Sequence, residues 1–157
     1  RDRLRSRGLG DVYKRQAIIE AGIDFDVVGI QLYFPGRDLV AVDLLLNAFA
    51  ALGKPIHITE MGVNGGFRQK GNAGSSWSQM AMSEGTWHGG WNEHTQADWL
   101  EQFYTIAASR KEIQALTWWD FIEPSFSGNG AMLYENENPR ESYFRLLALK
   151  NRIVRKA

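Results

Sequence analysis

One carboxylate stands at the end of a short apolar run, in a position where it could take part in a reaction. The run is PIHITE, residues 55–60, and its last residue is Glu60. Its composition and its flanking proline are typical of a β-strand. Strict alternation of side chains places Ile56, Ile58 and Glu60 on one face of that strand. In a parallel barrel, a charged side chain at the C-terminal tip of a strand is typical of a catalytic residue; the alternative is a surface Glu at a strand exit.

Two polar side chains lie at strand spacing in an earlier run, FDVVGIQLY, residues 25–33. β-Branched and aromatic residues make this run a predicted strand as well. One of its faces is apolar and suits a layer of helices. That face consists of Val28, Ile30 and Leu32. We therefore expect Gln31 and Tyr33, on the other face, to point toward the centre of the fold.

Aromatic and acidic residues cluster in a third run, ALTWWDF, residues 115–121. Neighbours in a strand face opposite ways, so one of Trp118 and Trp119 should lie over the mouth of the fold and the other against the helices. An indole ring at such a mouth suits the apolar face of a sugar, and plain core packing is the alternative for either ring. Asp120 and Glu123 follow and could hydrogen-bond sugar hydroxyl groups.

Helical segments alternate with these three predicted strands. The apolar spacing in residues 38–53 predicts a helix that begins at the cap Asp38 and ends at Gly53. A second helix is expected to begin at Thr95. The segment Asn138-Pro139-Arg140-Glu141 predicts the start of a third, with Asn138 as its cap.

Strict alternation of strand and helix predicts parallel β-α-β units and an α/β fold class. Three units alone would form a small open α/β fold. The nearly continuous apolar strands favour a sheet that is covered on both sides. A cut front end, for which residues 1–16 are the evidence, favours the C-terminal three strand–helix units of a (β/α)8 TIM barrel, truncated at its N-terminus, with residues 17–157 as part of the catalytic domain.

Residues 1–16 differ in composition from the rest of the chain. They hold six of the 18 basic residues and two of the 18 acidic residues, without apolar periodicity. One codon choice for DVYKRQ reads GAT GTG TAT AAG AGA CAG, which looks like the mosaic end of a transposon used to tag DNA. We interpret residues 1–16 as a cloning or sequencing scar, in preference to a basic nucleic-acid arm. Any export signal would then lie in a missing front part, which leaves the compartment open.

The remaining composition argues against several functions. Without residues 1–16 the chain has 12 basic and 16 acidic residues, a balance that argues against nucleic-acid and anionic-membrane partners. The chain has no cysteine, which excludes disulfides and thiolate metal sites. His57 is expected to face the helices, and His88 and His94 lack the spacing of metal ligands. We therefore expect no metal and no cofactor.

Four segments, taken in order, resemble glycoside hydrolase family 10, the xylanase-type family of (β/α)8 glycosidases. They are GIQLY followed by PG, then GKPIHITEMGV, ALTWWDF and PRESYFRLLAL. The resemblance runs from about residue 22 to residue 152, and the ITE segment after GKP is its most specific part. It implies a retaining hydrolase of a xylan-like, β-linked polysaccharide, with Glu60 as the nucleophile. It also implies that Trp118 floors the subsite beside the scissile bond and that Gln31 lines it.

Two departures from the family pattern leave the sugar specificity open. Tyr33 replaces a histidine of the family, although a tyrosine can still donate a hydrogen bond to the nucleophile. Residues 61–93 form a longer loop than is typical, with Trp77, Trp87 and Trp91. This loop is either an altered substrate surface or a lid packed on its own aromatic residues.

Catalysis with retention needs a second carboxyl, held about 5–5.5 Å from the nucleophile. In the family this acid/base follows an Asn on the fourth strand, which we expect to lie in the missing front part. Glu84, Glu93, Asp120 and Glu123 are the substitutes in this sequence, and none has that setting. We therefore expect a glycosidase whose fragment is inactive alone. The alternative is a non-catalytic carbohydrate-binding barrel or pseudoenzyme, and the oligomeric state is left open.

Overall fold

A computed structural model describes residues 17, 19–33, 38–66, 87–125 and 129–154 of the chain. Within them, three parallel strands form one sheet in the order β1-β2-β3. The strands are β1 at Val28–Tyr33, β2 at Ile56–Gly62 and β3 at Ile113–Trp118. The interpretation of residues 1–16 as a scar falls outside the described part and stays a prediction.

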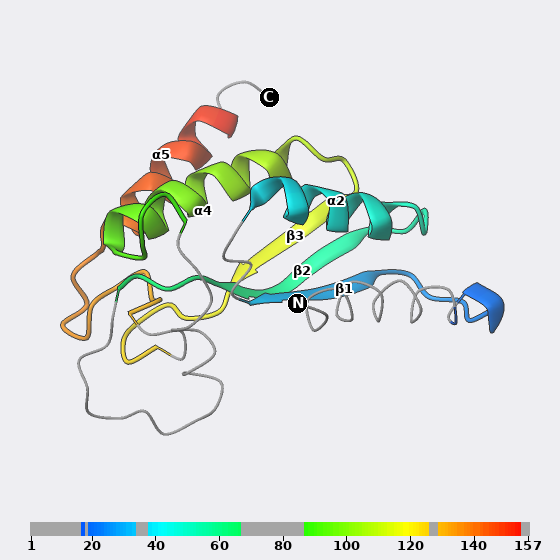
Figure 1. Cartoon of the computed structure of the whole chain (residues 1–157), viewed down its shortest axis with the longest axis horizontal. Coiled ribbons are helices and arrows are strands. Elements are labelled where there is room, and N and C mark those ends of the chain that lie inside the picture. The colour runs from blue at the N-terminus through cyan, green and yellow to red at the C-terminus, as the bar shows by residue number, and fades with distance from the viewer. Residues whose placement is uncertain (1–16, 18, 34–37, 67–86, 126–128, 155–157) are drawn as a thin grey trace.

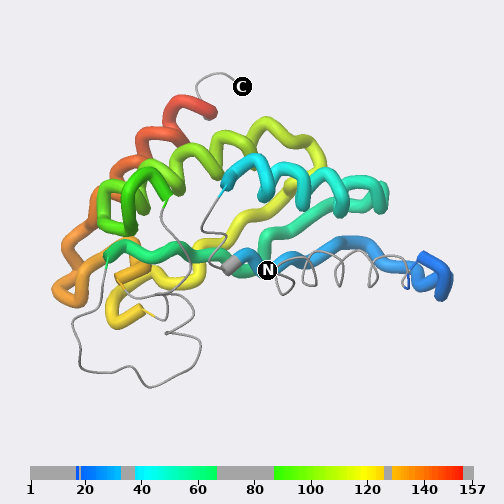
Figure 2. Tube along the Cα trace, viewed as in Figure 1, coloured from blue at the N-terminus to red at the C-terminus, as the bar shows by residue number. Residues whose placement is uncertain are grey.

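Three helices lie together on one face of this sheet (Figure 1). They are α2 at Leu39–Ala50, α4 at Glu93–Ala108 and α5 at Glu141–Val154. Each strand is followed along the chain by one of these helices, which confirms the predicted alternation. Figure 2 shows the trace returning over the same side of the sheet after each strand. In the described part of the chain, no helix is both long enough and apolar enough to cross a membrane.

Side-chain caps determine where α2 and α4 begin. Asp38 caps α2 as predicted, and its Oδ1 accepts a hydrogen bond from Val40 N at 2.8 Å. The predicted start of α4 at Thr95 is wrong by two residues. Asn92 is the actual cap, because its Oδ1 accepts from the backbone N of Thr95 at 2.9 Å.

The start of α5 also differs from the prediction. Asn138 does not cap the helix, which begins only at Glu141. Instead, the carbonyl of Asn138 accepts from Tyr134 N at 2.9 Å, within the turn that precedes the helix. Pro139 then forms an isolated bridge with Leu133. The Asn-Pro pair therefore closes a turn and does not open a helix.

The hydrophobic core lies between the sheet and the helices. Its buried side chains include Ile30, Leu32, Val42, Leu46, Ile56, Ile58, Met61, Val63, Trp99 and Phe103. The rings of Trp99 and Phe103 stack within α4, with centroids 5.1 Å apart. Large, fully buried side chains from β2 and α4 thus join the sheet to its helix layer.

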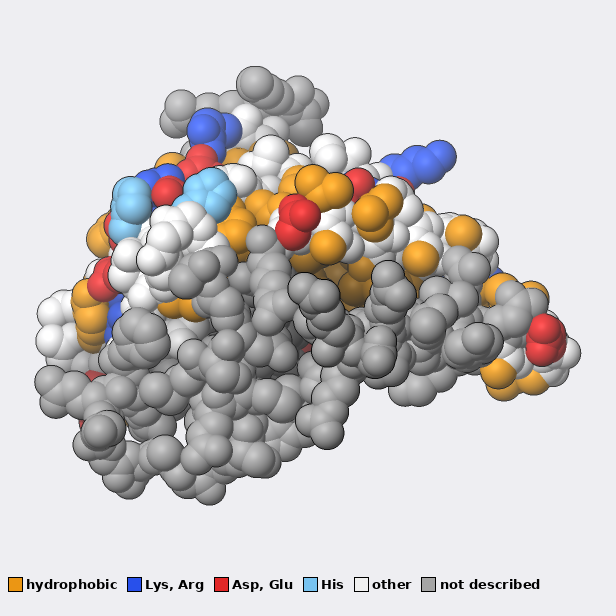
Figure 3. Space-filling model, in the orientation of Figure 1, with side chains coloured by type: hydrophobic (Ala, Val, Ile, Leu, Met, Phe, Trp, Pro, Cys, Tyr) orange, Lys and Arg blue, Asp and Glu red, His pale blue; other side chains and the backbone are white. Residues whose placement is uncertain are grey.

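Apolar surface remains at the margins of this arrangement. β1 and β3 are the edge strands of the described sheet. An apolar groove of about 380 Å³ follows β3 beneath α4 and α5, and its walls include Leu116 and Leu149. On α2, Val40 and Leu44 are exposed, and hydrophobic side chains are visible there in Figure 3.

Ion pairs join α5 to α4 on the outer side of the helix layer. The guanidinium of Arg145 contacts the carboxylates of Asp98 at 3.0 Å, Glu101 at 2.8 Å and Glu141 at 2.8 Å. Arg152 contacts Glu101 as well. Hydrogen bonds from Arg145 and then Arg152 hold the pKa of Glu101 below its ordinary value.

Replacing Leu46 by alanine should lower the free energy of unfolding by about 2–5 kcal/mol, because a fully buried leucine leaves a cavity. Leu44→Ala in the same helix is the matched control. Leu44 is 61% exposed and should change the free energy of unfolding by about 0.5 kcal/mol or less. Urea denaturation measures both variants, and equal losses would contradict the described packing of α2.

Glu101→Gln should destabilise the chain at neutral pH but not in acid. The pKa of Glu101 is lowered in the folded chain from its ordinary value of 4.5, so its ionised form stabilises the fold above that pH. The contribution disappears as the pH falls through the lower, folded pKa. Denaturant unfolding of both proteins from pH 7 downward measures this, and a gap that stays constant at every pH would refute it.

Candidate active site

Glu60 and Gln31 meet at the C-terminal half of the sheet. The two residues are partners in the parallel register of β1 and β2. The Nε2 of Gln31 donates a hydrogen bond to Glu60 Oε1 at 2.7 Å. Glu60 is half-buried and Gln31 is exposed, so the pair lies on the side of the sheet opposite the hydrophobic core. The structure therefore brings together two of the residues that the sequence indicated.

A β-bulge puts Glu60 on that side. Ile56, Ile58 and Met61 of β2 are fully buried in the helix-side core, so the core positions are two and then three residues apart. Ile30 of β1 pairs with Ile58, and the next residue, Gln31, pairs with Glu60. Thr59 is therefore an extra residue in β2, which is a β-bulge. The expectation that Glu60 shares a face with Ile56 and Ile58 is therefore wrong. Strict alternation would have turned Glu60 into the core.

His57 occupies the face opposite the one predicted. It alternates with Ile56 and Ile58, both of which face the helices, and it pairs with Gly29 and Ala115 in the sheet. It therefore lies on the side of Glu60, half-buried. Within the described ranges, no group of three or more His, Asp or Glu residues could hold a metal ion.

Tyr33 ends β1, and its backbone pairs with Gly62. Its side chain lies outside the described part of the structure. The hydrogen bond expected from Tyr33 to Glu60 therefore stays a prediction. The 61–93 loop is described only at its two ends, where Trp87 is buried and stacks on Trp91 with ring centroids 6.3 Å apart.

The two adjacent tryptophans face different surroundings. Trp118 packs against the hydrophobic core, and its Nε1 donates to the carbonyl of Gly130 at 2.9 Å. Trp119 is 51% exposed, and its backbone N donates to Met61 O at 2.8 Å. One ring is thus on each side, but Trp118 is the ring on the core side. This placement is contrary to the expectation that Trp118 is the platform beside the site.

Glu123 holds its own loop together. Its Oε2 accepts from Ser125 N at 2.5 Å, and its Oε1 accepts from Ala131 N at 3.1 Å. Arg140 lies 3.4 Å from the same carboxylate, whose side chain is only 11% exposed. Backbone amides and a guanidinium thus contact this carboxylate, and binding of Glu123 to a sugar hydroxyl group stays a prediction. Asp120 lies between β3 and this loop and is half-buried.

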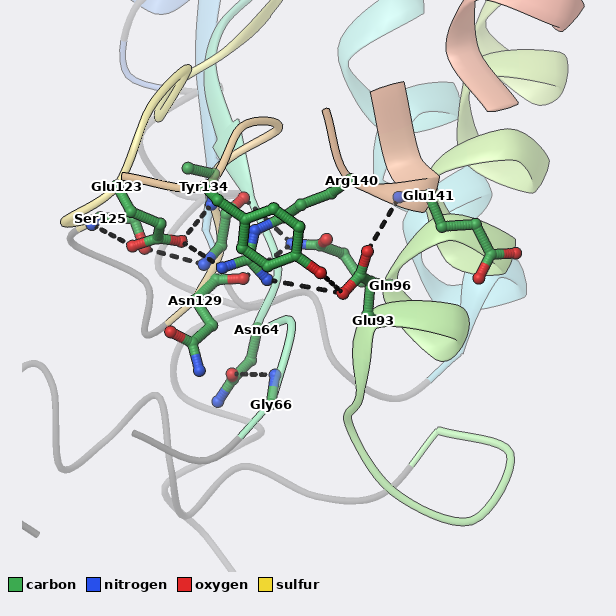
Figure 4. A network of polar contacts seen from close by, with 12 residues as sticks. Asn64, Gly66, Glu93, Gln96, Glu123, Ser125, Asn129, Tyr134, Arg140 and Glu141 are labelled. Atoms are coloured by element: carbon green, nitrogen blue, oxygen red, sulfur yellow. Dashed lines mark hydrogen bonds and ion pairs between the residues drawn. The ribbon is translucent and has the colours of Figure 1, made fainter. Parts of the chain in front are cut away.

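A polar network that the sequence analysis missed continues from Glu123 to the helix starts (Figure 4). Arg140 is 6% exposed and stacks over the ring of Tyr134, at 4.2 Å from its centroid. The hydroxyl of Tyr134 donates to Glu93 at 2.5 Å, and Glu93 also accepts from Glu141 N at 2.9 Å. The bond to Glu93, followed by burial, raises the pKa of the Tyr134 phenol. The contacts of this network join residues 41 and 48 positions apart at Glu93 and 17 apart at Glu123, and no regular spacing would have revealed them.

Comparison with known proteins relates the chain to one family and one fold. A family model described as Glycosyl hydrolase family 10 matches residues 11–148. Comparison with curated protein sequences gives no match. Xylanase 10B from Thermotoga maritima is similar over 92% of this chain and 42% of its own, with 20% identity and a TM-score of 0.63.

Two further solved structures extend the comparison. Xylanase 10B from Thermotoga petrophila RKU-1, in complex with xylobiose, is similar over 94% of this chain and 42% of its own, with 21% identity and a TM-score of 0.63. A Bifidobacterium dentium beta-glucuronidase complexed with coumarin-3-O-glucuronide is similar over 83% and 21%, with 20% identity and a TM-score of 0.56. The chain thus spans less than half of each of these proteins. The likeness confirms that its strand–helix units match part of a (β/α)8 barrel.

Deleting Thr59 should remove the bulge and destabilise the chain by only about 0.5–1.5 kcal/mol, the scale of its one lost hydrogen bond. Without the extra residue, Ile58, Glu60 and Met61 alternate regularly, so Met61 stays in the core and Glu60 stays beside Gln31. Thr59→Ala is the matched control, because it keeps the bulge and removes only the bond from Thr59 Oγ1 to Ile30 O at 3.2 Å. That loss should cost about 0.5–1.5 kcal/mol. Urea denaturation compares the two, and a much larger loss for the deletion would contradict the described pairing of β1 with β2.

Proposed function

The chain belongs to glycosyl hydrolase family 10, and on that premise we propose that it supplies the nucleophile and part of the sugar site of a retaining hydrolase. The proposed substrate is a xylan-like, β-linked polysaccharide. The observation that carries the proposal is the hydrogen bond of 2.7 Å between Gln31 Nε2 and Glu60 Oε1, at the strand ends and away from the core. Barrel enzymes place their reacting groups at this end of the sheet.

The amide of Gln31 prepares Glu60 for attack. An ionised carboxylate accepts hydrogen bonds only, and a donor held by the neighbouring strand orients it without a proton transfer. Glu60 would attack the anomeric carbon as the bond to the leaving oxygen breaks, which forms a covalent glycosyl-enzyme ester. Water would then cleave this ester and restore the carboxylate, with the anomeric configuration retained. Tyr33 is proposed as a second hydrogen-bond donor to Glu60.

The proton for the leaving oxygen needs a second carboxyl about 5–5.5 Å from the nucleophile. Two of the substitutes in this sequence have other tasks, since Glu93 binds Tyr134 and Glu141 N, and Glu123 binds its own loop. Glu84 lies outside the described residues. We propose that the acid/base comes from a part of the family barrel that this chain does not match, and that the chain alone does not hydrolyse its substrate.

Aromatic surface next to the site suits a sugar. Trp119 is 51% exposed and Phe121 is 60% exposed, two residues apart after β3. A flat, apolar ring with a polar edge matches the C–H face of a pyranose. This surface also supports the second candidate, a carbohydrate-binding barrel or pseudoenzyme that holds the polysaccharide without cleaving it. Asp120, which directly follows Trp119, is proposed to bind a sugar hydroxyl group.

Glu60→Gln should lower kcat on xylan by several powers of ten while the protein still binds xylo-oligosaccharides. The amide keeps the shape of the side chain but cannot form the covalent ester. The measurement is xylan hydrolysis by the complete gene product, with the product anomer followed by NMR and sugar affinity by calorimetry. Glu135→Gln, at an exposed position, is the control for loss of one carboxylate.

Two outcomes would contradict the proposal in different ways. Equal hydrolysis by the wild type and Glu60→Gln would remove Glu60 from the mechanism. Binding of xylo-oligosaccharides by both proteins without hydrolysis by either would favour the carbohydrate-binding candidate.

A further inference from the structure

We propose that Gln96 is a positioning residue that fixes the loop after β2 relative to the loop after β3, and thereby sets Glu60 against the Trp119 surface. The inference rests on the proposed function, because it concerns the two sides of the same site. Gln96 lies in the first turns of α4 and is fully buried. Its NH2 group binds backbone carbonyls of the two loops and would act on the site through them.

Three backbone carbonyls converge on the side-chain amide of Gln96. Its Nε2 donates to Val63 O at 3.1 Å and to Gly130 O at 3.0 Å, with Asn129 O at 3.5 Å. Val63 follows Glu60 by three residues along the chain, whereas Asn129 and Gly130 belong to the segment between β3 and α5. One NH2 group therefore bridges the two segments that carry the site.

The chemistry of this position requires a donor. The buried Oε1 of Gln96 has no hydrogen-bond partner among the described residues, so the contribution of the side chain lies in its NH2 group. Turning the amide over would bring Oε1 against carbonyl oxygens. A carboxylate here would repel the same three oxygens, and an apolar side chain would leave Val63 O without this donor. A buried, neutral carboxamide satisfies the arrangement.

The two segments lie too close together for independent movement. A Cβ atom added to Gly65 would lie 2.0 Å from Asn129 O, so only glycine permits this approach. Gly130 O accepts from Gln96 and also from the indole Nε1 of Trp118, at 2.9 Å. A shift of Gly130 would therefore reach Trp118 and its neighbour Trp119.

We call the bridge from Gln96 to the two loops the clamp. Because Gly130 O accepts from both Gln96 and Trp118, the Trp118 indole reports on the clamp by NMR without any sugar. Loss of the Gln96 donor should loosen Gly130 and expose the indole N–H of Trp118. In 15N-labelled chain, we expect hydrogen exchange of that indole to become about two- to tenfold faster in Gln96→Glu, the scale of one lost hydrogen bond. Gln96→Met, of similar length and uncharged, is the second variant if the charged one does not fold.

Two control variants separate positioning from general loss of stability. Gln102→Glu makes the same chemical change at an exposed site of α4 and should leave the exchange rate unchanged. Leu46→Ala lowers stability away from the two loops. Under conditions where each variant is folded, the affinity for xylotetraose should fall about tenfold in the Gln96 variants and stay constant in both controls.

The outcomes distinguish this inference from the proposed function. Unchanged indole exchange in the folded Gln96 variants would overturn the clamp, whatever the chain binds. Faster exchange with unchanged xylotetraose affinity would overturn its positioning role. Faster exchange in a chain whose wild type does not bind xylotetraose would uphold the clamp and count against the proposed function.

Discussion

Burial on the helix side of β2 is the constraint on which the site depends. Ile58 and Met61 both enter the core, although they are three residues apart in a strand whose faces alternate. Full burial of such a side chain contributes roughly 1.5–3 kcal/mol, so the strand bulges and fills both core positions. The bulge turns Glu60 away from the core and beside Gln31. The position of the candidate nucleophile thus follows from hydrophobic packing on the opposite face.

Polar contacts take over where the sheet ends. The loops beyond β2 and β3 contain buried backbone groups that need hydrogen-bond partners. Glu123 accepts from two backbone amides, and Gln96 donates to carbonyls of both loops. Arg140, buried between Glu123 and Tyr134, links these loops to the start of α5. The buried charge of Arg140 is tolerated because the guanidinium is paired with Glu123 and stacked on Tyr134. Removing either Arg140 or Glu123 would leave the other charge buried and unpaired.

The fold of this chain is similar to that of the two Thermotoga xylanases, although only about one residue in five is identical between the chain and either of them. A core of this kind accepts many apolar side chains of suitable volume, so the strand–helix layer tolerates extensive change. Loops are constrained by specific polar partners and vary more freely in length. This difference explains how the fold stays similar at such low identity.

The sequence by itself determined the alternation of strands and helices, the cap at Asp38 and the polar face of β1 with Gln31. It also determined the family, since the segment around Glu60 is specific enough. These features depend on residues that are neighbours along the chain, where propensity and spacing act directly. Apolar periodicity therefore predicted the three helices, and it erred at their ends: Asn92, and not Thr95, caps α4, and α2 ends at Ala50, before Gly53.

Only the tertiary structure decided which side chains reach the site. Three features depend on partners that are distant along the chain. The bulge at Thr59 involves a partner 29 residues away, the core-side position of Trp118 one 12 residues away, and the binding of Glu123 to its own loop one 8 residues away. The same holds for Gln96, which bridges carbonyls 33 and 34 residues distant. Strand parity read from sequence assumes an unbroken pleat. In β2 the pleat is interrupted by the bulge, because the side chains of three neighbouring strands must fill one core. This requirement arises only when the strands are packed together.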